Sequence, residues 1–233
     1  MSMTEIIFRS DVTVKLINSM ASDEAVTMAA RVSTGASENP EKDAGLINYL
    51  MRDRHGSPFE HNAFTFFIEA PIFVFREFMR HRIASYNEES GRYKELSPVF
   101  YVPSRDRKLV QQGRPGAYTF VEGDDCQMTS TRDSIVDMAE TAYYKYNDLL
   151  EKGIAREVAR MVLPVNIYSS MYVTINARSL MNFLSLRTIR EGTHFPSFPQ
   201  REIEMVAEKM EEFFAEKMPV TYETFNKNGR VAP

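Results

Sequence analysis

Residues 165–176 alternate between two kinds of side chain, and this alternation constrains the fold more than any other feature of the sequence. The odd-numbered positions are mostly apolar, from Val165 to Ile175, whereas the even-numbered positions are polar or tyrosine. A period of two residues is typical of a β-strand with one buried face and one face in water. The stretch therefore predicts a half-buried strand.

Patterns with a helical period occur on both sides of this strand. The clearest covers residues 130–151, where apolar positions recur every three or four residues and Gly153 follows the end. Ser22 is placed to cap a helix over 23–32. Further helices are predicted from Pro40, with Asn39 as the cap, to before Gly56; from Pro71 to about His81; and over 155–163, 177–187 and 200–217.

The remaining elements fix the fold class. Two short strands are predicted at Ile6–Phe8 and Val12–Ile17, joined by a turn at Ser10-Asp11, and a third at Asn62–Glu69. Strands and helices are mixed without regular βαβ alternation, which predicts an α+β fold with a mainly antiparallel sheet in one large domain, 1–233. Residues 93–127 have the weakest pattern, and 103–127 is predicted to be an irregular excursion.

Composition and charge exclude several classes of protein. The 28 basic and 32 acidic residues leave a net charge of −4, so no overall attraction to nucleic acid is expected. The longest stretch without charge, 161–177, contains prolyl, amide and hydroxyl side chains that a membrane helix would avoid. A single cysteine, Cys126, excludes an internal disulfide. With no apolar segment near the first residue, we expect a reducing, cytoplasmic setting and no membrane contact.

The densest group of functional side chains lies between Arg80 and Tyr93. Arg80 and Arg82 flank His81 at the predicted end of a helix, and a polar loop then leads through Ser90 to Arg92. Guanidinium groups bind phosphate oxygens in pairs, and loop amides add neutral donors. The segment thus predicts an anion site.

Two other interpretations of this segment remain open. The arginines could simply complement the dipole at the end of a helix. Tyr86 and Tyr93, interleaved with arginines, could instead form a nucleic-acid patch, although Glu88 and Glu89 argue against it.

Three later arginines, Arg160, Arg178 and Arg187, lie in strongly apolar stretches. A buried guanidinium is costly unless an anion meets it, so the sequence predicts a polyanionic ligand without naming it. His55 and His61 lie six residues apart, across a Gly and a Pro, and have no evident third ligand, so no metal is expected. The common glycine-rich nucleotide motifs are absent.

The motifs resemble those of the flavin-dependent thymidylate synthases. The segment Arg80-His81-Arg82, then seven residues, then Ser90 is similar to the signature of that family. The resemblance extends from about residue 5 to 226 through further motifs: Ala29-Ala30-Arg31-Val32-Ser33, Ser57-Pro58-Phe59-Glu60-His61, Ala70-Pro71-Ile72-Phe73, Arg156-Glu157-Val158-Ala159-Arg160 with Leu163-Pro164, and Asn176-Ala177-Arg178-Ser179-Leu180-Met181-Asn182-Phe183.

The resemblance implies a homotetramer with active sites at subunit interfaces. It implies an enzyme that makes thymidylate (dTMP) from deoxyuridylate (dUMP), with 5,10-methylenetetrahydrofolate as carbon donor and FAD, reduced by NADPH, as hydride source. Such chemistry needs an electron-rich uracil ring, and a cation near the imide would favour it, the role we assign to Arg187.

The site residues carried over from the family fall into two groups. The FAD contacts are Ser57, Arg80, His81, Arg82, Glu88, Asn176, Ala177, Arg178 and Asn182, with Ser33 a weaker candidate. The nucleotide contacts are Glu77, Phe78, Met79, Arg80, Glu88, Glu89, Ser90, Gly91, Arg92, Arg160 and Arg187.

Two positions depart from the family pattern. Glu77 stands where the family commonly has Gln, and His194 lies in an apparent insertion, so no role is transferred to it. Two alternatives to the enzyme are kept: a flavin- or nucleotide-binding regulatory protein that has lost catalysis, and, more distantly, an RNA-binding protein using residues 76–94.

Overall fold

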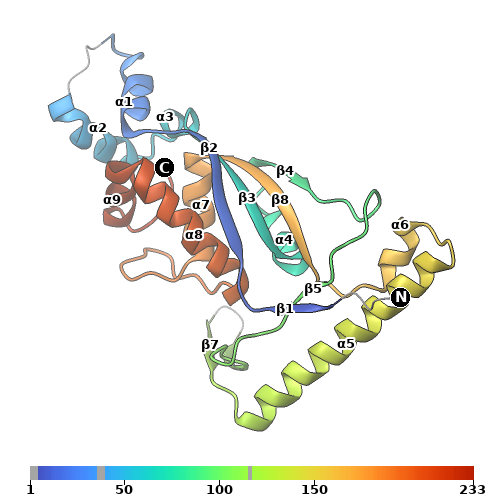
Figure 1. The fold of residues 1–233 in the computed structure, drawn as a ribbon. Helices are drawn as coiled ribbons and strands as arrows, with labels where there is room; N and C mark the ends of the chain where they lie inside the picture. Colours follow the sequence, from blue (N-terminus) through green and yellow to red (C-terminus); the bar gives the residue numbers. More distant parts are fainter. Residues whose placement is uncertain (1–4, 36–39, 115–116) are drawn as a thin grey trace. The chain divides into compact units, whose positions relative to one another are not determined.

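The computed structural model describes residues 5–35, 40–114 and 117–233 (Figure 1). The elements follow one another in this order: β1 (Ile7–Arg9), β2 (Thr13–Met20), α1 (Asp23–Arg31), α2 (Pro40–Arg52), α3 (Ser57–Glu60), β3 (Ala63–Pro71), α4 (Ile72–Phe78), β4 (Ala84–Glu88), β5 (Val99–Tyr101), β6 (Val110–Arg114), β7 (Ala117–Val121), α5 (Asp125–Glu151), α6 (Arg156–Ala159), the 3₁₀ turn η1 (Arg160–Val162), β8 (Tyr168–Asn176), α7 (Ala177–Arg187), α8 (Arg201–Lys217) and α9 (Pro219–Lys227).

The chain forms two compact units, and each unit is assembled from three separate segments. Unit 1 takes Met1–Val12, Glu69–Glu77 and Glu88–Ser170, and unit 2 takes Thr13–Ile68, Phe78–Asn87 and Met171–Pro233. Neither unit is a continuous stretch of sequence, so a simple cut of the chain would not separate them. The assignment of 1–233 to one domain stays a prediction.

Unit 2 is built on a four-stranded sheet in the order β2-β3-β8-β4. Alternate residues of β8 are buried and exposed, as a half-buried strand requires, so this prediction is confirmed with a later start at Tyr168. On the wet side the hydroxyls of Thr65 and Thr174 meet at 3.0 Å. On the apolar side Phe64 of β3 lies edge-on to Phe214 of α8, with ring centroids 6.1 Å apart. Helix α8 thereby covers the apolar face.

Unit 1 has its core between the parallel strand pair β1–β5 and the long helix α5. The rings of Phe100 on β5 and Tyr143 on α5 are edge-on with centroids 6.0 Å apart, and Tyr146 is fully buried beside them. The turn predicted at Ser10-Asp11 does not join a hairpin, because β1 pairs with β5 and β2 belongs to the four-stranded sheet. Long-range pairing overrides the local turn signal here.

The predicted irregular excursion at 103–127 was wrong. It contains the antiparallel hairpin β6–β7, whose register pairs Val110 with Val121. Within this segment, residues 115–116 lie outside the described part of the chain. Helix α5 also begins earlier than predicted, because Asp124 accepts from the Gln127 amide and the Gln127 side chain accepts in return from the Asp124 amide.

Most other predicted elements are present. Ser22 caps α1 by accepting from the Ala25 amide at 3.1 Å. Helices α7 and α8 match their predicted ranges, whereas α9, which begins at Pro219, was missed. The cap predicted at Asn39 lies outside the described residues. The α+β class with a mainly antiparallel sheet is confirmed. Among the described helices, none has the length and apolar character to cross a membrane.

Candidate functional site

The residues predicted for the site are divided between the two units. Unit 2 holds Ser57, Phe78, Met79, Arg80, His81, Arg82, Asn176, Ala177, Arg178, Asn182 and Arg187. Unit 1 holds Glu77, Glu88, Glu89, Ser90, Gly91, Arg92 and Arg160.

In unit 2, the structure brings together His81 and Arg187, which are 106 residues apart in sequence. Arg187 is the last residue of α7, and its Nε donates to Nε2 of His81 at 3.1 Å. Phe183, one turn earlier on α7, lies edge-on to the imidazole with ring centroids 4.8 Å apart. The end of α7 therefore determines the surroundings of His81.

The turn that carries His81 is fixed by tyrosine and phenylalanine side chains. The prediction placed Arg80 and Arg82 at the end of a helix that runs to about His81. Helix α4 instead ends at Phe78, so both arginines lie beyond it. The Tyr86 hydroxyl donates to the His81 carbonyl at 2.5 Å and to the Phe78 carbonyl at 3.2 Å. The buried Phe78 ring stacks on Phe183 at 4.4 Å. The Phe78 side chain is thus part of the core, and its carbonyl already accepts from Tyr86 and from the His81 amide.

His81 is neutral near pH 7 because of where it lies. Burial and, to a smaller extent, the nearby Arg187 cation together lower the pKa of His81 to about 4. Since Nε2 accepts a hydrogen bond, the ring proton is on Nδ1, which remains a donor.

We expect His81 to make the protein sensitive to acid. Its pKa in the folded state lies below the usual 6.5, so the unfolded state binds more protons between pH 6.5 and 4, and stability should fall as the pH drops through this window. His81→Gln should flatten that part of the profile, whereas His194→Gln, which changes an exposed histidine, should not. Urea unfolding from pH 7 to 4 measures both, and equal profiles for wild type and His81→Gln would contradict the assignment.

Arg178 already has an internal partner. Its Nη1 donates to the Glu60 carboxylate at 2.6 Å, and its Nε donates to the Pro233 carbonyl. Gly56 makes this approach possible, because a side chain there would collide with both the guanidinium and that carbonyl. From the sequence, Arg178 was expected to require an anionic ligand to balance its charge. This expectation was wrong, since the Glu60 carboxylate already balances it.

The other predicted cofactor residues of unit 2 differ in their availability. Asn176 caps α7 by accepting from the Ser179 amide at 2.8 Å, and the Ala177 amide donates to the Asn62 carbonyl at 2.8 Å. Ser57 and Asn182 have exposed side chains. Arg80 and Arg82 are also exposed, as is Met79, and neither arginine forms an ion pair with a described residue. These two cations remain available to an anionic ligand.

In unit 1, Glu88 sits among groups of both charges. Burial raises its pKa, and the Glu89 carboxylate acts in the same direction. The Ser169 hydroxyl and the cations Arg76 and Arg160 oppose this and lower the pKa. Arg76 and Arg160 are exposed, and neither pairs with a carboxylate within the described ranges. A second pair of available cations thus flanks a partly desolvated carboxylate.

The loop after Glu88 is held by its own contacts. The Glu89 carboxylate binds Lys94 at 2.7 Å and the Ser170 hydroxyl at 3.1 Å, so it is already occupied. Ser90 Oγ accepts from the Arg92 amide at 3.3 Å, and the Arg92 side chain pairs with Glu157 at 3.0 Å.

Gly91 marks a close approach within unit 1. A Cβ at this buried position would lie 3.2 Å from Cδ of Arg160 and from Leu96. The absence of a side chain thus lets the stem of Arg160 lie along the loop. Arg160 is exposed rather than surrounded by apolar groups, so the predicted burial penalty at this residue was wrong. Glu77 is half-buried, and Ser33, the weaker candidate, is exposed in unit 2.

Comparison with known proteins decides the family. The family model described as thymidylate synthase complementing protein matches residues 15–220. The chain belongs to the flavin-dependent thymidylate synthase family. A flavin-dependent thymidylate synthase of Streptomyces avermitilis is 63% identical over 234 residues, covering 97% of this chain and 95% of that protein. One from Tropheryma whipplei strain TW08/27 is 58% identical, covering 97% of each.

Solved structures agree with this family assignment. The UMP/dUMP methylase PolB from Streptomyces cacaoi, bound with 5-Br UMP, superposes with a TM-score of 0.92 at 54% identity, covering 98% of this chain and 99% of that one. The same enzyme bound with 5-Br dUMP gives a TM-score of 0.93 at 53% identity, covering 98% and 100%. The protein is therefore an enzyme of the flavin-dependent thymidylate synthase family.

Reasoning from the sequence missed three residues that shape this family site. Glu60 pairs with Arg178, Tyr86 fastens the turn of His81, and Phe183 lines the imidazole. Glu60 and Phe183 belong to the motifs that carried the resemblance, so their place in those motifs was the available signal. In the described parts of the chain, no group of three or more His, Cys, Asp or Glu is arranged to hold a metal ion.

Proposed function

We propose that this protein catalyses the reductive methylation of dUMP to dTMP. The carbon donor is 5,10-methylenetetrahydrofolate, and FAD reduced by NADPH is the source of the hydride. The working form is a cytoplasmic homotetramer. The observation that carries the proposal is the Arg187 guanidinium, held at 3.1 Å against a neutral His81 in a member of this family.

The donor set fits a flavin adenine dinucleotide. Its two phosphates need cations that are not already neutralised, and Arg80 and Arg82 are exposed without a carboxylate partner in the described chain. Bound there, the flavin supplies the hydride chemistry. The residues that hold it are Ser57, Arg80, His81, Arg82, Glu88, Asn176, Ala177, Arg178 and Asn182.

The nucleotide is bound by a second set of residues. Arg160 is exposed beside Gly91 and supplies a cation for the phosphate of dUMP. The nucleotide contacts are Glu77, Phe78, Met79, Arg80, Glu88, Glu89, Ser90, Gly91, Arg92, Arg160 and Arg187.

Arg187 activates the pyrimidine in this proposal. A fixed cation beside the uracil imide favours the ionised form of the ring, which is electron-rich at the carbon to be methylated. Neutral His81 serves this purpose better than a charged one, because it accepts from Arg187 instead of repelling it. Its Nδ1 proton can be donated to a bound ligand.

The ribonucleotide UMP is an alternative candidate substrate for the site. PolB, at 54% identity, is a UMP/dUMP methylase and was solved with 5-Br UMP. The ribonucleotide UMP carries the same base and phosphate as dUMP, so the residues assigned above do not by themselves reject it. We favour dUMP, because the relative at 63% identity is a thymidylate synthase.

The experiment is a turnover assay on the purified protein reconstituted with FAD. With methylenetetrahydrofolate and NADPH present, dTMP should form from dUMP, and omission of FAD or NADPH should abolish it. A parallel assay with UMP gives the ratio of kcat/KM for the two nucleotides. A protein that binds FAD but methylates neither nucleotide would support the regulatory alternative, and one that cannot bind FAD would refute the proposal.

Cys126 should be dispensable for turnover. The unrelated classical thymidylate synthases use a cysteine nucleophile, but Cys126 is exposed in the first turn of α5 and is the one cysteine of the chain. Cys126→Ala should keep kcat within about twofold, because surface substitutions of this kind rarely disturb a fold. A folded, flavin-loaded Cys126→Ala protein without activity would contradict the flavin mechanism.

A further inference from the structure

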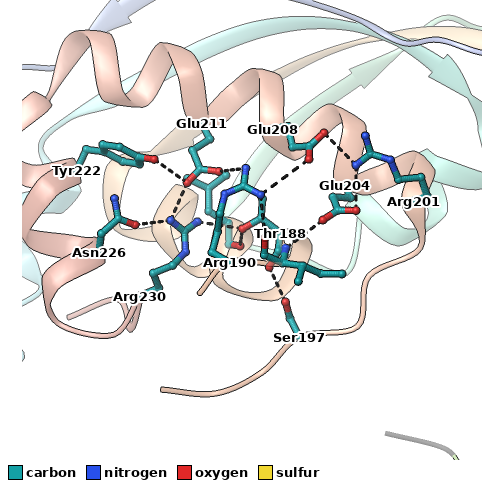
Figure 2. A network of polar contacts seen from close by, with 12 residues as sticks. Thr188, Arg190, Ser197, Arg201, Glu204, Glu208, Glu211, Tyr222, Asn226 and Arg230 are labelled. Atoms are coloured by element: carbon teal, nitrogen blue, oxygen red, sulfur yellow. Dashed lines mark hydrogen bonds and ion pairs between the residues drawn. The ribbon is translucent and has the colours of Figure 1, made fainter. Parts of the chain in front are cut away.

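An arginine outside the predicted site is buried in unit 2 and binds three different groups. Arg230 is 3% exposed and has a positive φ of 58°. Its Nη1 donates to Glu211 at 2.7 Å and to Asn226, and its Nη2 donates to Thr188 at 2.9 Å (Figure 2). Glu211 is on α8, and Thr188 directly follows the last residue of α7.

Thr188 forms the hydrogen bonds that hold the C-terminal end of α7 in place. It is fully buried, and its hydroxyl accepts from Arg230 while donating to the Leu184 carbonyl at 2.7 Å. Its own carbonyl accepts from the Ser197 hydroxyl at 2.6 Å. The next residue, Ile189, donates its amide to Glu204 on α8 at 3.0 Å. The backbone immediately after Arg187 is thus held from several sides.

The rest of the network holds Arg230 itself in place. Glu211 also accepts from Arg190 at 2.7 Å and from the Tyr222 hydroxyl at 3.2 Å (Figure 2). The cluster therefore joins α8, α9 and the end of α7. Stability alone is a poor explanation for such a cluster, because apolar side chains of similar volume stabilise a core as well as a buried ion pair does. A polar network gives directional contacts instead, and here one of them, from Arg230, ends on the residue after Arg187.

We propose that Arg230 and Thr188 are positioning residues that aim the Arg187 guanidinium at His81. The Arg187 side chain extends from the final turn of α7, so a rotation or fraying of that turn would move its Nε away from His81 Nε2. The hydroxyl of Thr188 prevents this by bonding to Leu184 in the same turn and to Arg230 outside it. The effect on turnover rests on the proposed function, but the effect on geometry does not.

The decisive comparison is between two variants that each lose one hydroxyl from the same network. Thr188→Val removes the contacts to Arg230 and Leu184 and keeps the side-chain shape. Tyr222→Phe, the matched control, removes the contact to Glu211 and leaves Thr188 untouched. The first readout is the Nε2 resonance of His81 in protein labelled with ¹⁵N-histidine, assigned by its loss in His81→Gln. The second is kcat at saturating nucleotide, and thermal unfolding of each variant is recorded alongside.

We expect Thr188→Val to shift the His81 Nε2 resonance and to lower kcat at least tenfold, with less than a twofold change in the FAD dissociation constant. Tyr222→Phe should keep the wild-type resonance and stay within twofold in kcat, even though it too lowers the melting temperature. Thr188→Ser, which retains the hydroxyl, should restore both readouts.

The opposite results would overturn the proposal. It fails if Thr188→Val keeps the wild-type resonance, or if Tyr222→Phe shifts it equally. Should Thr188→Val not fold, Arg230→Lys replaces it, because lysine keeps the charge near Glu211 but cannot reach two partners as a fork. If the wild-type enzyme methylates neither UMP nor dUMP, the proposed function fails, and the resonance still decides the positioning role.

Discussion

Arg187→Ala is expected to lower the turnover of dUMP by about 10²–10³-fold, the usual cost of removing one preorganised electrostatic group from an active site. The variant should still fold, because Arg187 ends a helix and is only half-buried. It should also bind FAD with little change, since the assigned flavin contacts lie on other residues. Rates at saturating dUMP, together with a flavin titration, measure the two effects separately.

A matched control uses an arginine that is not assigned to the site. Arg52, exposed on α2, pairs with its neighbour Asp53 at 2.8 Å, and Arg52→Ala should leave turnover within twofold. Arg187→Lys should fall between wild type and Arg187→Ala, because lysine keeps the cation but loses the Nε donor that meets His81. Near-normal kcat in Arg187→Ala would mean that another group activates the pyrimidine.

The fold was predictable where local signals and packing agree. Helix α7 matches its predicted range because Asn176 caps its start and an apolar face runs through it to Arg187. The hairpin β6–β7 was missed for two different reasons. The strand β6, with the sequence VQQGR, is polar and gives no strand signal, whereas β7, with the sequence AYTFV, is rich in β-formers and was a readable signal. The capping box of Asp124 and Gln127 was a readable local signal that would have placed the start of α5 correctly.

The site was predictable in composition but not in pairing. The excess of arginines was visible in the sequence, whereas their partners come from distant segments: Glu60 meets Arg178 across 118 residues, and His81 meets Arg187 across 106. No periodicity records such contacts, because they arise only once the strands and helices have packed. The family motifs identified the candidate residues, whereas the neighbours of these residues and the protonation state of His81 became known only from the structure.

Glu211→Gln is expected to lower the free energy of unfolding by about 3–5 kcal/mol, the range for removal of one partner from a buried ion pair. The Glu211 side chain is 5% exposed and meets both Arg230 and Arg190 at 2.7 Å. A carboxamide cannot balance two cations, so the buried charge of Arg230 would be left uncompensated. Glu208→Gln is the matched control, because Glu208 pairs with Arg201 nearer the surface, and it should cost less than about 1 kcal/mol.

Urea unfolding measures these differences in unfolding free energy, provided that the variants share the same dependence of that free energy on urea concentration. A double variant, Glu211→Leu with Arg230→Met, tests the reason for the cost, because replacing both charges by apolar groups is often neutral for stability. We therefore expect the double variant to recover most of the stability that Glu211→Gln loses. It should not recover turnover, since methionine cannot donate to Thr188, and the end of α7 would remain loose beside Arg187. A double variant that regains both stability and kcat would show that the network serves folding alone.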